Sequence, residues 1–149
     1  MTLDNSVNSI DILLVEDNLG DARLAMEALK ESKIKNNLHN VTDGEEASDF
    51  LFRRGKYVNA VRPDLILLDL NLPKKDGREL LAEIKHSPEL KRIPVVILTT
   101  SKAEEDIIKT YDLHANCYIT KPLDLNQFMK VIKSIEEFWL TIVVLPTGK

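Results

Sequence analysis

The stretch LILLDLNLP, residues 65–73, decides the fold class, because a run of four apolar residues ends abruptly at the carboxylate of Asp69. Apolar runs of about four to eight residues between polar breaks are typical of strands buried on both faces of a parallel sheet. We therefore expect a buried parallel strand at Leu65–Leu68, with Asp69 at its carboxyl end.

Two more apolar runs end next to charged side chains. The run ILLV at residues 12–15 precedes Glu16 and Asp17, and CYI at residues 117–119 lies just before Lys121. The carboxyl ends of parallel strands meet at one edge of a sheet. We therefore expect three carboxylates and one ammonium to converge there, a combination that suits a divalent cation together with an anion.

Helical patterns alternate with the strand patterns, as in a doubly wound α/β sheet. Two further strands, a weak one near Leu38–Val41 and one at Val95–Leu98, bring the expected total to five parallel strands. Five helices are expected, at Ala22–Ser32, from a capping box of Asp43 and Glu46 through Phe52, around Leu80–Ile84, at Ala103–Asp112 and ending near Trp139. The predicted division is an extension at 1–9, one domain at 10–139 and an apolar tail at 140–149.

Composition excludes several classes of function. The chain has 149 residues, a formal net charge of -4 and a pI near 5.4, so no basic face for nucleic acid is evident. The single cysteine, Cys117, cannot form an internal disulfide, and the first residues do not resemble a signal peptide. The apolar stretch Ile142–Leu145 is far shorter than the roughly 20 residues that span a bilayer. We expect a cytoplasmic protein that binds neither nucleic acid nor a membrane.

The residue types at this edge point to phosphoryl chemistry. A carboxylate is a poor nucleophile toward phosphate because anions repel, so Asp69 needs a cation to bridge it to an incoming phosphoryl group. Mg²⁺ is the expected cation, since it binds through one or two carboxylates and keeps positions for water and a phosphoryl oxygen. Glu16, Asp17 and Asp69 would supply the negative charge.

Two further side chains have predicted roles in this chemistry. The ammonium of Lys121 can offset the charge that accumulates on a phosphoryl group. Thr99 closes the fourth expected strand, and its hydroxyl can donate to a phosphoryl oxygen only when that group is present. Thr99 is therefore predicted to act as a switch.

The motifs together resemble the receiver domain of two-component response regulators. The resemblance covers nearly the whole chain and depends on VEDN at 15–18, LLDLNLP at 67–73, DG at 76–77, LTT at 98–100 and YITKP at 118–122. It implies the flavodoxin-like strand order 2-1-3-4-5. It also implies that a histidine kinase donates a phosphoryl group to Asp69 and that the phosphorylated protein signals to a protein partner.

The same resemblance assigns roles to two more residues. It implies that the backbone carbonyl of Asn71 is a metal ligand and that Tyr118 moves inward with Thr99 as part of the switch. The family commonly has Asp-Asp where this chain has Glu16-Asp17, so the longer side chain leaves open whether Glu16 contacts the metal directly or through water.

Two segments resemble a narrower group. The segment RRGKY at 53–57 and the ending FWLTI at 138–142 are similar to single-domain regulators that partner bacterial, notably cyanobacterial, phytochromes. Residues Arg53–Lys56 could also be a solvated surface with no partner.

Two other classes remain open at this stage. A phosphoaspartate hydrolase of the haloacid dehalogenase type also uses an Asp nucleophile and Mg²⁺, but it needs an Asp two residues later as general acid, where this chain has Asn71. A pseudo-receiver would bind partners without taking phosphate, but it should have lost part of the acidic set or Lys121. We therefore expect a signalling protein and not an enzyme.

The apolar residues near the end of the sequence predict a protein–protein interface. Only about ten residues follow the last expected helix, so we expect no attached output domain. The last expected helix and the tail contribute seven large apolar side chains: Phe138, Trp139, Leu140, Ile142, Val143, Val144 and Leu145. We expect a homodimer through this helix and tail, as the resemblance also implies. The alternative is a tail that folds back over its own domain.

Overall fold

The structure is a computed structural model, and it describes residues 9–32, 35–99, 117–121 and 124–144. Five parallel strands form one sheet in the order β2-β1-β3-β4-β5, which confirms the predicted flavodoxin-like order. The strands are β1 (Ile10–Val15), β2 (Asn36–Val41), β3 (Leu65–Asp69), β4 (Val95–Thr99) and β5 (Cys117–Thr120).

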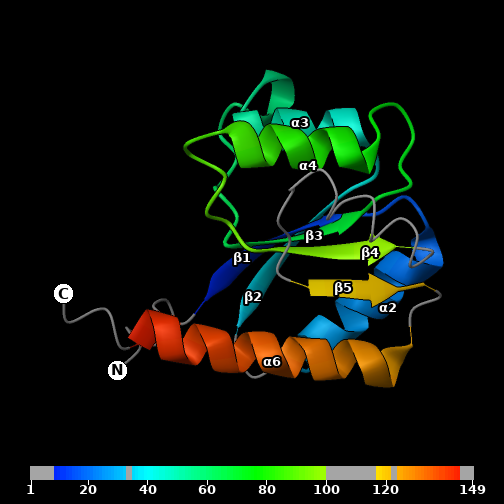
Figure 1. Cartoon of the computed structure of the whole chain (residues 1–149), viewed down its shortest axis with the longest axis vertical. Coiled ribbons are helices and arrows are strands. Elements are labelled where there is room, and N and C mark those ends of the chain that lie inside the picture. Colours follow the sequence, from blue (N-terminus) through cyan, green and yellow to red (C-terminus); the bar gives the residue numbers. More distant parts are fainter. Residues whose placement is uncertain (1–8, 33–34, 100–116, 122–123, 145–149) are drawn as a thin grey trace.

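Four α-helices and one 3₁₀ helix lie in the described residues. They are α2 (Leu19–Lys30), α3 (Gly44–Phe52), η1 (Gly55–Tyr57), α4 (Gly77–His86) and α6 (Leu125–Val144). Helices α3 and α4 cover one face of the sheet, and α2 and α6 cover the other (Figure 1). The helix predicted at 103–112 lies outside the described residues.

The central strands are buried on both faces, as their apolar runs predict. Every residue of β3 is buried, and so is every residue of β4. Alternate residues belong to two separate apolar clusters, because successive strand side chains point to opposite faces. Ile66 and Leu68 pack with α3 and α4, whereas Leu65 and Leu67 pack with α2 and α6.

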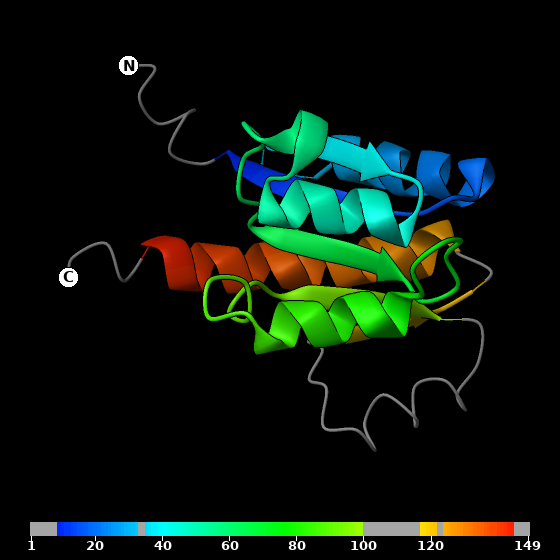
Figure 2. The same ribbon diagram turned by 90° about the horizontal axis from the view of Figure 1, so that it is seen from above.

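Two element boundaries and one helix cap differ from the sequence-based expectation for a clear physical reason, and several other boundaries differ by one or two residues. Helix α2 begins at Leu19 and not at Ala22, because Asn18 caps it by accepting a hydrogen bond from the backbone N–H of Asp21. Helix α6 continues to Val144, beyond the predicted end near Trp139, since no glycine or proline interrupts its apolar sequence. The C-terminal end of α6 projects beyond the sheet (Figure 2).

The third difference concerns the cap of α3. Asp43 caps the helix as predicted, and its side chain accepts a hydrogen bond of 2.7 Å from the backbone N–H of Glu46. The carboxylate of Glu46, however, accepts from the N–H of Thr42 and not from that of Asp43. The predicted capping box is therefore only half formed, because the Glu46 side chain reaches one residue further back.

The arrangement brings the carboxyl ends of β1, β3, β4 and β5 to one edge of the sheet. Their register aligns Asp69 with Leu98, the next-to-last residue of β4, and Thr99 with Thr120, so the carboxyl ends of neighbouring strands lie side by side. Within the described ranges, no helix is both long enough and apolar enough to cross a membrane.

Candidate functional site

Three carboxylates gather at this edge, as the strand pattern predicts. Glu16 and Asp17 follow β1, and Asp69 is the last residue of β3. One oxygen from each of the three lies within 4.8 Å of the others. Glu16 and Asp69 are buried, with only 1% and 2% of their surface exposed, whereas Asp17 is exposed. The cluster is thus open to solvent on one side.

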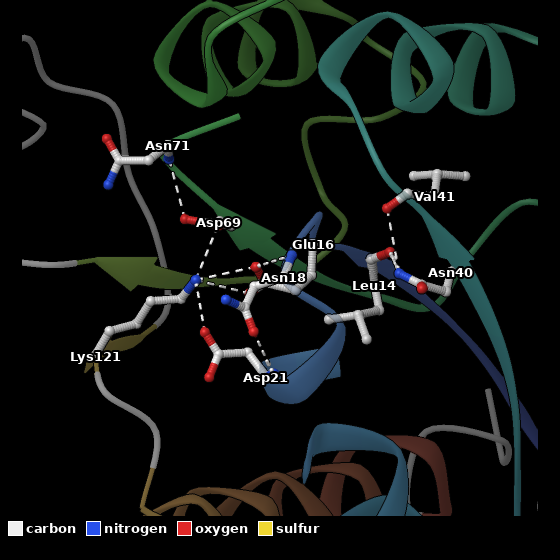
Figure 3. A network of polar contacts seen from close by, with 9 residues as sticks. All are labelled: Leu14, Glu16, Asn18, Asp21, Asn40, Val41, Asp69, Asn71 and Lys121. Atoms are coloured by element: carbon white, nitrogen blue, oxygen red, sulfur yellow. Dashed lines mark hydrogen bonds and ion pairs between the residues drawn. The ribbon is translucent and has the colours of Figure 1, made fainter. Parts of the chain in front are cut away.

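Lys121 faces the cluster from the end of β5. Its Nζ lies 2.9 Å from Oδ2 of Asp69 and 3.0 Å from the carboxylate of Glu16 (Figure 3). The backbone N–H of Lys121 donates a hydrogen bond of 2.7 Å to the carbonyl of Thr99, which fixes the residue to the end of β4. Four predicted site residues, Glu16, Asp17, Asp69 and Lys121, therefore meet in the structure.

Burial and neighbouring charges shift the pKa values of Glu16 and Lys121. Desolvation of Glu16 and the neighbouring Asp69 carboxylate raise the pKa of Glu16 to about 7, although Lys121 opposes this rise. Burial lowers the pKa of Lys121, but its hydrogen bonds to carboxylates outweigh burial and raise that pKa above its usual value. Lys121 is therefore charged at neutral pH.

The turn after Asp69 fixes its carboxylate. Oδ1 of Asp69 accepts a hydrogen bond of 3.0 Å from the backbone N–H of Asn71 (Figure 3). The two oxygens of Asp69 thus have different partners, since Oδ2 faces Lys121. The backbone carbonyl of Asn71, which the resemblance implies as a metal ligand, belongs to the same turn.

Thr99 and Tyr118 lie on adjacent strands. Thr99 is fully buried at the end of β4, and Tyr118 is half-buried in β5 opposite Ile97. Ile97 and Tyr118 both pack on the side of the sheet that α3 and α4 cover. Thr99 is two residues after Ile97, so strand alternation directs its side chain to that same side.

The donor set fits a divalent cation that prefers oxygen ligands. Oε1 of Glu16 is buried, and it accepts no hydrogen bond from any residue that the structure describes, although Lys121 Nζ lies 3.0 Å away. A buried carboxylate oxygen without a hydrogen bond is costly unless a cation or water compensates it. The Lys121 ammonium compensates part of this cost, and a divalent cation beside the three carboxylates would add to that compensation and favour the ionised form of Glu16.

Sequence reasoning missed one residue of this site. Asp21, in the first turn of α2, places its carboxylate oxygen 3.1 Å from Lys121 Nζ. The apolar spacing predicts a helix that begins only at Ala22, which puts Asp21 outside it. The signal that could have found Asp21 is Asn18 followed three residues later by an acid, the pattern of a helix N-terminus.

Comparison with known proteins identifies the family of this chain. Residues 12–133 match the response regulator receiver domain family. The chain belongs to this family. It is 58% identical over 137 residues to the response regulator Rcp1 of Synechocystis sp., a match that covers 92% of this chain and 93% of Rcp1.

Two solved structures of response regulators superpose on this receiver. A phosphorylated cyanobacterial phytochrome response regulator, RcpA, is 59% identical with a TM-score of 0.78, over 90% of this chain and 96% of RcpA. The Mn²⁺-bound form of Rcp1 is 57% identical with a TM-score of 0.76, over 88% of this chain and 94% of Rcp1.

Family membership confirms the predicted class of function. The protein is a receiver-type response regulator of a two-component system, and neither the hydrolase nor the pseudo-receiver interpretation is favoured. The acidic cluster of this receiver has the residue types of a divalent metal site.

Proposed function

We propose that Asp69 accepts a phosphoryl group from a histidine kinase in a Mg²⁺-dependent step. The observation that supports this most directly is the position of the Asp69 carboxylate, 2.9 Å from Lys121 Nζ and clustered with Glu16 and Asp17. An oxygen of Asp69 forms a bond to phosphorus while the bond between phosphorus and the kinase imidazole breaks. The imidazole nitrogen keeps the electron pair and takes up a proton.

The residues around Asp69 would have different roles in phosphoryl transfer. Glu16, Asp17 and the carbonyl of Asn71 would hold the cation together with Asp69. Mg²⁺ held there would neutralise charge on the phosphoryl oxygens and so reduce their repulsion of the Asp69 carboxylate. Lys121 contributes a second positive charge at the same place, while the Asn71 N–H orients Asp69.

Thr99 and Tyr118 form the proposed switch. A phosphoryl group on Asp69 gives the Thr99 hydroxyl a new acceptor, and this contact exists only in the phosphorylated state. Tyr118 packs on the same side of the sheet, so the space beside β4 and β5 would change when Thr99 moves. The changed surface would then be recognised by a protein partner.

The phosphoryl group serves as a signal in this proposal and is not passed to a separate substrate. The position two residues after Asp69 is Asn71, which cannot act as the general acid of a phosphoaspartate hydrolase. Sustained turnover of a phosphate ester by the purified protein would contradict this part of the proposal.

The partners are proposed from the relatives. RcpA is described as a cyanobacterial phytochrome response regulator, so a bacterial phytochrome is the histidine kinase to test first. We also propose a cytoplasmic location and a homodimer through α6 and the residues after it. The apolar sequence of residues 138–145 and the projection of α6 beyond the sheet support this dimer (Figure 2).

Phosphotransfer to single-residue variants tests the proposed site. The wild type should be labelled by a phosphorylated kinase or by acetyl phosphate only when Mg²⁺ is present, and Asp69→Asn should not be labelled. Asp64→Asn is a matched control, because Asp64 is also an acid next to β3 but precedes the strand at its other end. Label that persists on Asp69→Asn would show that the site is wrongly assigned.

A further inference from the structure

Three carboxylates lie within ion-pair distance of the Lys121 ammonium. Nζ lies 2.9 Å from Asp69, 3.0 Å from Glu16 and 3.1 Å from Asp21 (Figure 3). A lysine ammonium has three N–H donors and no acceptor. Each donor therefore already has a carboxylate partner, and a new oxygen can be bound well only if one of the three is released.

The three carboxylates differ in what it costs to release them. The side chains of Glu16 and Asp69 are 0% and 2% exposed, so either would be left charged in a buried place without its ammonium unless a bound cation or a phosphoryl group compensates it. The side chain of Asp21 is 22% exposed, and water can replace the lysine there at lower cost. Asp21 is therefore the partner that Lys121 can exchange most readily.

Asp21 is also held in place independently of its side chain. Its backbone N–H donates a hydrogen bond of 2.9 Å to Oδ1 of Asn18, the N-cap of α2. The carboxylate thus projects from a capped first turn toward Lys121 (Figure 3). Loss of the Asp21 side-chain charge would leave this cap intact.

We infer that Asp21 is a positioning residue, which holds Lys121 in the unphosphorylated protein and gives way to a phosphoryl oxygen when Asp69 is modified. This inference rests on the proposed phosphoacceptor role of Asp69. The carboxylate of Asp21 opposes the phosphorylated state in two ways, because it competes for the ammonium and because its negative charge repels the phosphoryl group. Asp21 thereby sets how tightly the site retains an anion.

Binding of beryllium trifluoride, a phosphoryl mimic, tests the inference at saturating Mg²⁺ with fluorine NMR and calorimetric titration. Asp21→Asn should bind the mimic about twofold to fivefold more tightly than the wild type, the range expected for one partly exposed ion pair. Glu27→Gln removes the same charge from an exposed position of α2 and should bind like the wild type. Asp21→Glu keeps the charge on a longer side chain and should also stay close to the wild type.

The outcomes separate the inference from the function on which it rests. A wild type that binds the mimic, together with an Asp69→Asn variant that does not, supports the proposed site. Unchanged or weaker binding by Asp21→Asn then overturns the inference alone. Equal tightening in Asp21→Asn and Glu27→Gln overturns it as well, because general charge and not contact with Lys121 would be the cause. A wild type that does not bind overturns both.

Discussion

Substitution of Gly77 by alanine should destabilise the protein, although alanine is the better helix former. Gly77 is the first residue of α4, and a Cβ atom built there would lie 2.6 Å from the Asp69 carbonyl oxygen and 2.6 Å from Cα of Leu70. These atoms cannot easily move away. The N–H of Leu70 donates a hydrogen bond to the carbonyl of Leu98. The N–H of Gly77 donates a hydrogen bond of 3.0 Å to the carbonyl of Leu70.

The size of the effect follows from two opposing contributions. Alanine gains up to about 1 kcal/mol over glycine inside a helix, and less in the first turn. Overpacking against a fixed neighbour costs about 1 to 3 kcal/mol, and two contacts with backbone atoms place this site at the upper end. We therefore expect Gly77→Ala to lower the free energy of unfolding by about 2 kcal/mol.

Urea denaturation of matched glycine variants measures this difference. Gly20 is the second residue of α2, and a Cβ atom there would meet only the side-chain oxygen of Asn18, at 3.3 Å. Gly20→Ala should therefore change the free energy of unfolding by no more than about 1 kcal/mol, because the gain in helix propensity is offset only by a small shift of the Asn18 side chain. If Gly77→Ala proves as stable as the wild type, the close approach of α4 to the end of β3 does not constrain the turn beside Asp69.

Three further predictions concern the switch, the surface near η1 and the end of the chain. Thr99→Ala should still be phosphorylated but lose much of the phosphorylation-dependent spectral change in NMR; complete loss of phosphorylation would contradict the division of roles. Burial and the hydrogen bond to Glu46 raise the pKa of Tyr57 from 10.0 to about 12, so the neutral phenol stabilises the fold below pH 10 and this contribution is lost as pH rises toward 12. The difference in unfolding free energy between wild type and Tyr57→Phe should narrow over that range, and a constant difference would refute the assignment. Trp139→Ala should weaken association of the homodimer by about 2 kcal/mol or more, measured by sedimentation, and a wild type that is monomeric at high micromolar concentration would exclude the dimer.

The strand ends of the site could be predicted because a parallel sheet leaves little freedom there. Once Leu65–Leu68 is recognised as a buried strand, the position of Asp69 follows, and the same holds for Glu16 and Lys121. Asp21 could not be found in this way. Its role depends on where α2 begins and on how far one side chain reaches, and periodicity does not specify either.

The C-terminal end of α6 is a second feature that the sequence pattern does not specify. Its residues Phe128 and Ile132 lie four positions apart, on one face of the helix, and both are buried. Apolar residues continue after Trp139 without a stop signal, so their sequence is equally consistent with a separate tail. The helix continues to Val144 because helical hydrogen bonds satisfy the backbone for as long as no residue interrupts them.

Lys121 connects the carboxylate cluster to the sheet, because its side chain contacts the carboxylates while its backbone is bonded to a strand. Its ammonium bonds Asp69 and Glu16, and its backbone N–H bonds the carbonyl of Thr99 at the end of β4. A group that draws the ammonium to a new position therefore acts on a residue whose main chain is fixed to β4. Because buried cores shift between discrete packings more readily than they deform gradually, such a pull would favour rearrangement at β4 and β5 over a change confined to the site.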